Sequence, residues 1–312
     1  MKIINNQKGY TTSIILLLLL IPLLLLLTIT IDEYNHEVDN TVENLQTKKM
    51  KSTTKDFENE IATITKQTLH DTTLDVITRK QALTNSKKYI KDKIQSKIDT
   101  IEQKQRKNNI NIECTVNEIK PADDPFKIEI HYTLHVTTNN SNSKIQKEEN
   151  RHIEITDTKY PVYDPLPTLK TRATFTDSKV EYTDKLANYI TINNSNAYLN
   201  STQHVTIKKC PINDYSQHGN SNITIKNCLN NHYYHNSHDG LCLLCRLENR
   251  TTCEHYGFET FILPTEKFDK APASIDHVLL NDQQGQYEGN NITIDNNTII
   301  YLDNGHKIKY GL

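Results

Sequence analysis

The longest apolar run of the chain is residues 14–31, which contain no charge and are dominated by leucine. At about 1.5 Å per residue, a helix of this length spans about 27 Å, close to the thickness of the hydrocarbon core of a bilayer. Pro22 lies within the run, and membrane-spanning helices tolerate proline. The run therefore predicts a single transmembrane helix, with the lipid bilayer as its partner.

The flanks of this run predict its orientation. Lys2 and Lys8 precede it, whereas acidic residues follow it from Asp32 to Asp39. Positive charges stay on the cytoplasmic side, so residues 1–13 are expected inside and the bulk of the chain outside the cytoplasmic membrane. A cleaved secretory signal is the competing interpretation, but residues 27–32 contain no pair of small residues that would form a cleavage site. We therefore expect an uncleaved anchor, or one cut on its cytoplasmic side.

The next segment, residues 32–107, contains neither proline nor glycine and has a helical pattern. Ile90, Ile94, Ile98 and Ile101 recur at steps of four, four and three, which places them on one helix face. A weaker stripe runs from residue 61 to residue 77. We expect a long helix that continues outward from the membrane as a stalk, a break near residues 84–86, and a second helix ending near Arg106.

Beyond the stalk the hydrophobic period changes to two. Residues 110–116, 128–136 and 152–155 alternate between apolar and polar side chains. This pattern is typical of half-buried strands and predicts an antiparallel meander over residues 108–160, with a turn at residues 139–142 and one face packed on the preceding helix. Helices followed by an antiparallel sheet make an α+β fold.

The remaining sequence divides into three segments. Three prolines make residues 160–169 unsuitable for a helix or a central strand, so this segment marks a boundary. A connector over residues 161–203 begins there, and residues 184–190 within it are a candidate for a short helix. Residues 204–264 are rich in cysteine and histidine. Residues 265–312 predict two β-hairpins, with strands at 291–294, 298–302 and 306–310 and with Asn304 and Gly305 in the second turn.

The layout of the N-terminus resembles a known family. Lys8 and Gly9 stand directly before the apolar run, separated from it by Tyr10 and three polar residues. This layout is similar to the leader of archaeal type IV pilin-like proteins, in which a peptidase cuts after the glycine. The resemblance covers about 30 residues and implies that the mature chain begins at Tyr10. A long helix followed by an antiparallel sheet is similar to the pilin architecture as well.

One position departs from the pilin pattern. Pilins carry a glutamate at the fifth mature position, which helps subunits to dock, and this sequence has Ile14 there. A plain signal anchor therefore stays open as the alternative. The whole chain also looks like uncharacterised surface proteins of methanogenic archaea, a likeness that implies no activity.

Composition excludes some functions. The formal net charge of −2 argues against binding to nucleic acid, which needs a basic surface. The sequence contains no phosphate-binding glycine loop, no Ser-His-Asp order and no paired-carboxylate signature, so we predict no enzymatic activity. Seven sequons lie on the side expected to be outside and are candidates for N-glycosylation: Asn139, Asn193, Asn200, Asn222, Asn249, Asn291 and Asn296.

Five of the six cysteines fall between residues 210 and 253, among several histidines. The candidate ligands or disulfide partners are Cys210, Cys228, Cys242, Cys245, Cys253, His232, His235, His238 and His255, with His218 nearby. Disulfides are the first interpretation, since they are expected outside the membrane where little apolar material can form a core, and Cys114 could pair with the odd fifth cysteine. Six cysteines allow fifteen pairings, and the sequence does not choose among them.

A structural zinc site is the second interpretation of this region. The spacing Cys242-x-x-Cys245 is that of a zinc knuckle, and Cys210, Cys228, Cys253 or His255 could complete a tetrahedron. The third interpretation is chemistry at a reactive thiol or at a metal-bound water. Haem attachment fails because Arg246 stands where the motif needs histidine.

These patterns predict a structural or adhesive surface protein, pilin-like in plan, which displays a stapled Cys/His-rich module on a helical stalk. Its partners would be like subunits or other surface proteins. The alternative is a membrane-anchored metal-dependent enzyme, or a metal-binding sensor, that uses the segment from His232 to His255.

Overall fold

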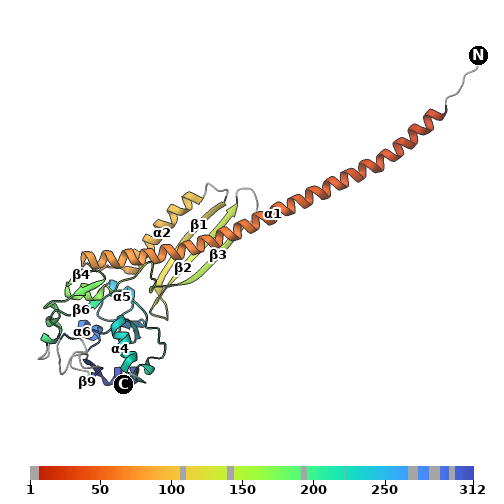
Figure 1. Ribbon diagram of the computed structural model, residues 1–312. Helices are drawn as coiled ribbons and strands as arrows, with labels where there is room; N and C mark the ends of the chain where they lie inside the picture. Colours follow the sequence, from red (N-terminus) through yellow and green to blue (C-terminus); the bar gives the residue numbers. More distant parts are fainter. Residues whose placement is uncertain are drawn as a thin grey trace, which may run out of the picture.

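The computed structural model describes residues 7–105, 110–138, 144–190, 195–220, 222–265, 273–280, 289–294 and 299–312. A single long helix projects from a globular part, and the rest of the described chain is gathered around the C-terminal end of this helix (Figure 1). The architecture is α+β, with the long helix first and antiparallel sheets after it, as the sequence predicts.

Helix α1 (Gln7–Arg79) runs through the apolar segment and onward without a break. The leucines and isoleucines of residues 14–31 are all exposed, and the helix is long and apolar enough to cross a membrane. From Met50 onward one face of α1 is buried, including Phe57 and Ile61. The predicted long helix and its break are confirmed: α1 ends at Arg79, and α2 (Ser86–Gln105) follows after a short turn. The expected end at Arg106 lies outside the described residues.

The three-stranded meander consists of β1 (Ile110–Pro121), β2 (Lys127–Thr138) and β3 (Lys144–Glu154), each antiparallel to the next. Ile90, Ile94 and Ile98 of α2 are fully buried in the core that the helices share with the sheet. The side chain of Gln95 accepts from the amide of Val116 and donates to the carbonyl of Cys114, both at 2.8 Å, and so satisfies backbone groups of the edge strand β1. The predicted turn at residues 139–142 lies outside the described residues.

Strand β3 is longer than the alternation at residues 152–155 indicates. Its half-buried positions are mostly polar: Lys147 lies 2.8 Å from the carboxylate of Glu58, and Arg151 donates to the backbone oxygen of Glu58 at 2.6 Å. These long side chains pack against α1 through their polar groups, and this is why the strand lacks an apolar period.

The proline-rich segment corrects a prediction. Residues 166–169 belong to a short helix, α3 (Leu166–Thr171), although the sequence argument excluded helix here. Pro165 is the N-cap and Pro167 lies in the first turn, where the amide has no partner within the helix and its loss has no cost. The short helix expected at residues 184–190 is present as a 3-10 helix, η2 (Lys185–Asn188).

The proline-rich segment does not divide the hydrophobic core. A second small sheet, β4 (Thr174–Thr176), β5 (Lys179–Glu181) and β6 (Thr202–His204), follows α3, and η3 (Ser195–Tyr198) precedes β6. One continuous cluster of buried residues includes Phe57 of α1, Ile130 of β2, Tyr182 of the connector and Leu247 of the Cys/His-rich region. The stalk end, the meander and the connector therefore share one core with part of the Cys/His-rich region, and a second buried cluster lies around Cys228 and Ile300 in the later segments.

The Cys/His-rich region consists of short elements. These are η4 (Tyr215–Asn220), α4 (Asn222–Asn231), β7 (His235–Ser237), α5 (Leu243–Leu247) and β8 (Gly257–Glu259). Strands β7 and β8 pair in antiparallel register, with His235 opposite Glu259. Helix α6 (Ile275–Leu280) follows them. The chain closes with β9 (Gly289–Thr293), β10 (Ile299–Asp303) and α7 (Asn304–Tyr310).

The C-terminal segment confirms one predicted hairpin and corrects the other. β9 and β10 pair as expected, but residues 304–310 form a helix rather than a third strand. Asp303 caps this helix, because its Oδ1 accepts from the amide of His306 at 3.0 Å. His306 and Tyr310, one helical turn apart, are buried, whereas Ile308 is 80% exposed. The alternation that predicted a strand therefore has no counterpart in the packing.

Candidate metal centres

Four side chains from separate short segments between residues 210 and 235 converge at one point. The Cys2His2 cluster consists of Cys210, His218, Cys228 and His235, all buried, with their ligand atoms within 4.8 Å of one another. Cys210 precedes η4, His218 lies in η4, Cys228 lies in α4, and His235 opens β7. Helix α4 and η4 pack on each other and thereby bring the ligands of separate short elements to one point.

The distances within the Cys2His2 cluster match a tetrahedral metal site. With Zn–S of about 2.3 Å and Zn–N of about 2.0–2.1 Å, a tetrahedron places ligand atoms about 3.3–3.8 Å apart. Nε2 of His218 lies 3.1 Å from Sγ of Cys228, 3.5 Å from Sγ of Cys210 and 3.3 Å from Nε2 of His235. The two sulfur atoms are 3.4 Å apart. The four atoms thus surround a position that a zinc ion would fill.

Contacts around the cluster fix the ligand orientation. Nδ1 of His218 lies 2.9 Å from the carbonyl oxygen of Tyr215 and donates to it, so the lone pair of Nε2 points toward the other ligands. The rings of Tyr215, Tyr310 and Phe261 contact His235 edge-on. Burial lowers the pKa of His235, which favours the neutral form that binds metals.

The thiol pair of this cluster is set for ionisation. The hydrogen bond between Cys210 and Cys228 lowers the pKa of Cys210, despite its burial, and raises that of Cys228. Cys210 therefore loses its proton first. A thiolate is the form of cysteine that binds a metal.

A second group, the Cys3His cluster, consists of Cys242, Cys245, Cys253 and His255. Nδ1 of His255 lies 3.5 Å from Sγ of Cys253, 3.8 Å from Sγ of Cys242 and 4.0 Å from Sγ of Cys245. Cys242 is the N-cap of α5 and Cys245 lies in its first turn, so the Cys-x-x-Cys spacing brings both sulfurs to one helix end. Hydrogen bonds from Cys242 and Cys245 lower the pKa of Cys253 well below that of an ordinary thiol.

The structure separates the predicted residues into these two groups and excludes two histidines from both. All five cysteines of the region, His235 and His255 are members, together with His218. His232 instead stacks on His204 with ring centroids 3.9 Å apart, and His238 contacts the ring of Tyr256. The sequence contains one zinc-knuckle spacing, Cys242-x-x-Cys245, and it belongs to the Cys3His cluster. The ligands of the Cys2His2 cluster are widely spaced in sequence and form no compact motif.

The disulfides that the sequence argument favoured are not formed. All six cysteines are free thiols, and Cys114, proposed as the partner of the odd cysteine, is buried in β1. Burial raises its pKa to about 12, so this thiol is inert. The five cysteines of the module belong instead to groups that have the composition of structural zinc sites.

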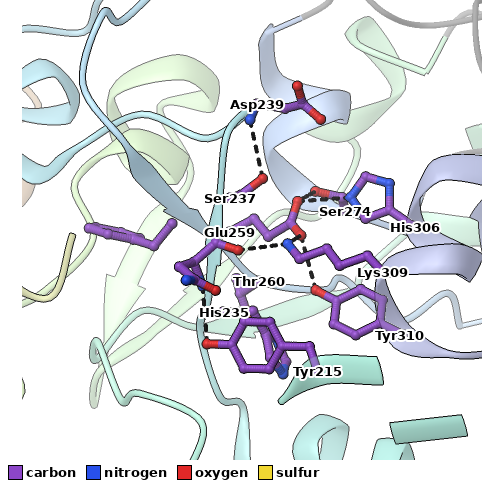
Figure 2. A network of polar contacts seen from close by, with 12 residues as sticks. Tyr215, His235, Ser237, Asp239, Glu259, Thr260, Ser274, His306, Lys309 and Tyr310 are labelled. Carbon is purple, nitrogen blue, oxygen red and sulfur yellow. Dashed lines mark hydrogen bonds and ion pairs between the residues drawn. The ribbon is translucent and has the colours of Figure 1, made fainter. Parts of the chain in front are cut away.

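A third group was missed by the sequence argument. The Glu-His-His cluster consists of Glu259, His277 and His306, all buried, from β8, α6 and α7. Figure 2 shows Glu259 between Ser274, His306, Lys309 and Tyr310, all pointing at its carboxylate. Burial opposes charge on His306, but Glu259 and Asp303 outweigh it and raise its pKa to about 10. The three members are far apart in sequence and follow no ligand spacing, so no local signal could have found them.

The hairpin β7–β8 connects the three groups. His235 of the Cys2His2 cluster pairs with Glu259 of the Glu-His-His cluster across the two strands. The segment between the strands carries all four ligands of the Cys3His cluster. Gly240 and Gly257 pass so close that a Cβ added to Gly257 would lie 2.1 Å from the backbone oxygen of Gly240. The hairpin is therefore the scaffold on which the candidate centres are placed.

The candidate glycosylation sites differ in accessibility. Asn200 and Asn291 are exposed, and Asn249 is half-buried with a left-handed backbone. Asn222 lies in α4. Asn139, Asn193 and Asn296 lie outside the described residues.

Gly9 and Tyr10, the predicted leader junction, lie within α1.

Comparison with protein-family models, with curated proteins and with solved structures found no match for the chain. The interpretation of the candidate centres therefore depends on their geometry.

Proposed function

We propose that this chain is a single-pass membrane protein that displays a zinc-stabilised module on a helical stalk, on the outer side of the cytoplasmic membrane. The Cys2His2 cluster is the observation that carries the proposal. Its four ligands are buried and stand at tetrahedral spacing, which is the composition and closed coordination of a structural zinc site.

A structural role for zinc follows from the surrounding elements. The helices and strands of the module, residues 204–264, are short, and none is longer than the ten residues of α4. Elements of this length gain little stability from local hydrogen bonding. Zinc in small metallo-peptides contributes about 10–16 kcal/mol to folding. We therefore assign the two cysteine-containing clusters to stabilisation of the module and not to catalysis.

The test is to measure thiolate-bound zinc in the full-length protein, purified anaerobically in detergent without added reductant. A mercurial reagent releases only metal that thiolates hold, and we expect it to release two zinc ions per chain, one for each cluster. A chelator should then allow rapid proteolysis between His204 and Pro264, whereas a reductant alone should not. Absence of released zinc, with unfolding by reductant, would establish disulfides and overturn the proposal.

The location and orientation rest on the N-terminal segment. Residues 14–31 expose their apolar side chains along the whole run, as expected for contact with lipid. Lys8 before the run and Asp32 after it support an inside N-terminus. Protease added to right-side-out spheroplasts should degrade the module. Full protection of the module would refute this orientation.

An exposed apolar stripe on the stalk indicates a second copy of the chain as its partner. Tyr34, Val38, Val42 and Leu45 are 40–68% exposed and follow one another at steps of four, four and three. They form one apolar stripe of α1 directly beyond the membrane. Copies anchored in the same bilayer would present this stripe at the same height and in parallel, which favours side-by-side helix packing, as in a pilin-like assembly.

This self-association can be tested with two matched variants of α1. Val38→Glu should reduce chemical cross-linking of the full-length protein in detergent, whereas Asn40→Glu, on the opposite helix face, should not. Equal cross-linking of both variants would remove the stripe as the contact.

The pilin-like leader is tested separately by N-terminal sequencing. The proposal expects Tyr10 as the first residue, and retention of Met1 would leave a plain signal anchor.

A further inference from the structure

The Glu-His-His cluster differs from the two cysteine clusters in its composition and in its position. It has three ligand groups rather than four, and none of them is a thiol. One member, His306, lines a cleft of about 420 Å³ together with Asp239, Tyr256 and Lys309. Two histidines and a glutamate are the ligand set of zinc sites that keep one coordination position open.

The ligand atoms of the cluster are close enough to share one ion. Oε2 of Glu259 lies 3.0 Å from Nε2 of His306, where the two groups form an ion pair in the absence of metal. A metal ion would displace the proton of Nε2 and bind both atoms, which lie about 3.3 Å apart on a tetrahedral zinc. The rings of His277 and His306 have centroids 4.7 Å apart, and the ligand atoms of all three residues fall within 4.8 Å of one another.

The surroundings orient these ligands as the outer contacts of metal sites do. Oδ2 of Asp303 accepts from Nδ1 of His306 at 2.5 Å, which directs Nε2 toward Glu259. Lys309 and Tyr310 hold the other oxygen of Glu259, Oε1, at 2.5 and 3.0 Å. The carboxylate is thereby fixed with Oε2 facing His306, and Ser274 donates to the same oxygen at 3.2 Å (Figure 2).

We propose that Glu259, His277 and His306 form a third metal site, which binds one divalent transition-metal cation of the zinc type and leaves a coordination position toward the cleft for water or a small anion. The site shares no ligand with the two cysteine clusters, although His235 and Glu259 lie on the same β7–β8 hairpin. Asp303 acts as a positioning residue for His306.

The experiment is a cobalt titration of the full-length protein in detergent, after a weak chelator has removed the metal that thiolates do not hold. The two cysteine clusters then keep their zinc, and the Glu-His-His cluster starts without metal. Zinc held by thiolates exchanges slowly, so added Co²⁺ should fill the third site first and give a visible spectrum without thiolate-to-metal charge transfer. Azide should shift this spectrum, because a three-ligand site has a free position. His277→Gln and Glu259→Gln should each remove about one equivalent of bound cobalt, and His238→Gln, a cleft residue outside the cluster, should remove none.

Each outcome distinguishes a metal site from a structural ion-pair network. If the folded wild-type protein binds no cobalt beyond the thiolate sites, or if the variants bind as much as wild type, the cluster is a structural ion-pair network and the proposal is wrong. A spectrum that azide leaves unchanged would overturn the open position. The mercurial measurement reports only the cysteine clusters, so failure of the third site and failure of the proposed structural zinc are distinguishable.

Discussion

The guanidinium of Arg246 donates to the carboxylate of Asp164 across 82 residues of sequence, with Nη1 and Oδ2 2.7 Å apart and neither side chain exposed. The same guanidinium reaches Asp276 and the backbone oxygens of Leu241 and Phe258. Arg246 follows Cys245 directly in α5, and Asp276 precedes His277 in α6. One buried cation therefore joins the connector, the Cys3His cluster and the Glu-His-His cluster.

We expect Arg246→Met to destabilise the protein by about 3–5 kcal/mol, since it leaves two buried carboxylates without a cation. Arg250→Met is the matched control on the same segment. Arg250 pairs with Glu248 but is 57% exposed, so its loss should cost about 0–1 kcal/mol. Urea unfolding of the zinc-loaded proteins measures both. Equal midpoints for the two variants would contradict the structural role of the buried cation.

The close pass of Gly240 and Gly257 predicts that the hairpin accepts no side chain there. In Gly257→Ala the new Cβ would lie 2.1 Å from the backbone oxygen of Gly240, so the segment at Gly240 must move away from β8, and we expect a loss of at least about 2–3 kcal/mol. Gly305→Ala is the control, because its Cβ would meet only the side chain of Asp303 at 3.1 Å. Thermal unfolding should be lowered clearly in the first variant and little in the second; the reverse order would show that the hairpin is not tightly packed.

The cysteines should divide into metal ligands and an inert core thiol. Cys242→Ser with Cys245→Ser should release one zinc ion per chain and make the segment from His204 to Pro264 sensitive to protease. Cys114→Ala should keep all the zinc, because Cys114 lies in β1 and belongs to neither cluster. Metal analysis and limited proteolysis of both proteins provide the measurement. Retention of zinc in the double variant would remove Cys242 and Cys245 as ligands.

Stability in acid should depend on Glu129 of β2. Burial opposes its ionisation, but hydrogen bonds from Lys120, Asn150 and His131 outweigh it and lower its pKa to about 2. A lowered folded-state pKa contributes stability that is present above the ordinary pKa of about 4.5 and is lost as the pH falls toward 2. The unfolding midpoints of wild type and Glu129→Gln should therefore differ near pH 5 and converge toward pH 2.

Glu118→Gln, at an exposed position of the neighbouring strand β1, is the control for this titration. Both variants keep the metal ligands, so effects of acid on metal binding are shared with wild type and cancel in the difference. A gap between wild type and Glu129→Gln that is constant from pH 5 to pH 2 would contradict the lowered pKa.

Some parts of the fold follow from local periodicity in the sequence. The uncharged run of residues 14–31, the isoleucines of α2 and the alternation in β1 and β2 each indicate an element directly, because one face of each element contacts a single environment. The Cys-x-x-Cys pair is local in the same sense: four residues bring two sulfurs to one helix end, whatever the rest of the chain does.

Contacts between distant segments set which ligands belong to each cluster and which short segments form helices. His218 and His235 join Cys210 and Cys228 only because η4, α4 and β7 pack together. Glu259 and His306 are 47 residues apart and meet through β8 and α7. Residues 306–310 alternate like a strand but form a helix, because the cap at Asp303 and the burial of His306 and Tyr310 outweigh a weak local preference. Contacts between distant residues have no signature in local spacing, so only the folded chain reveals them.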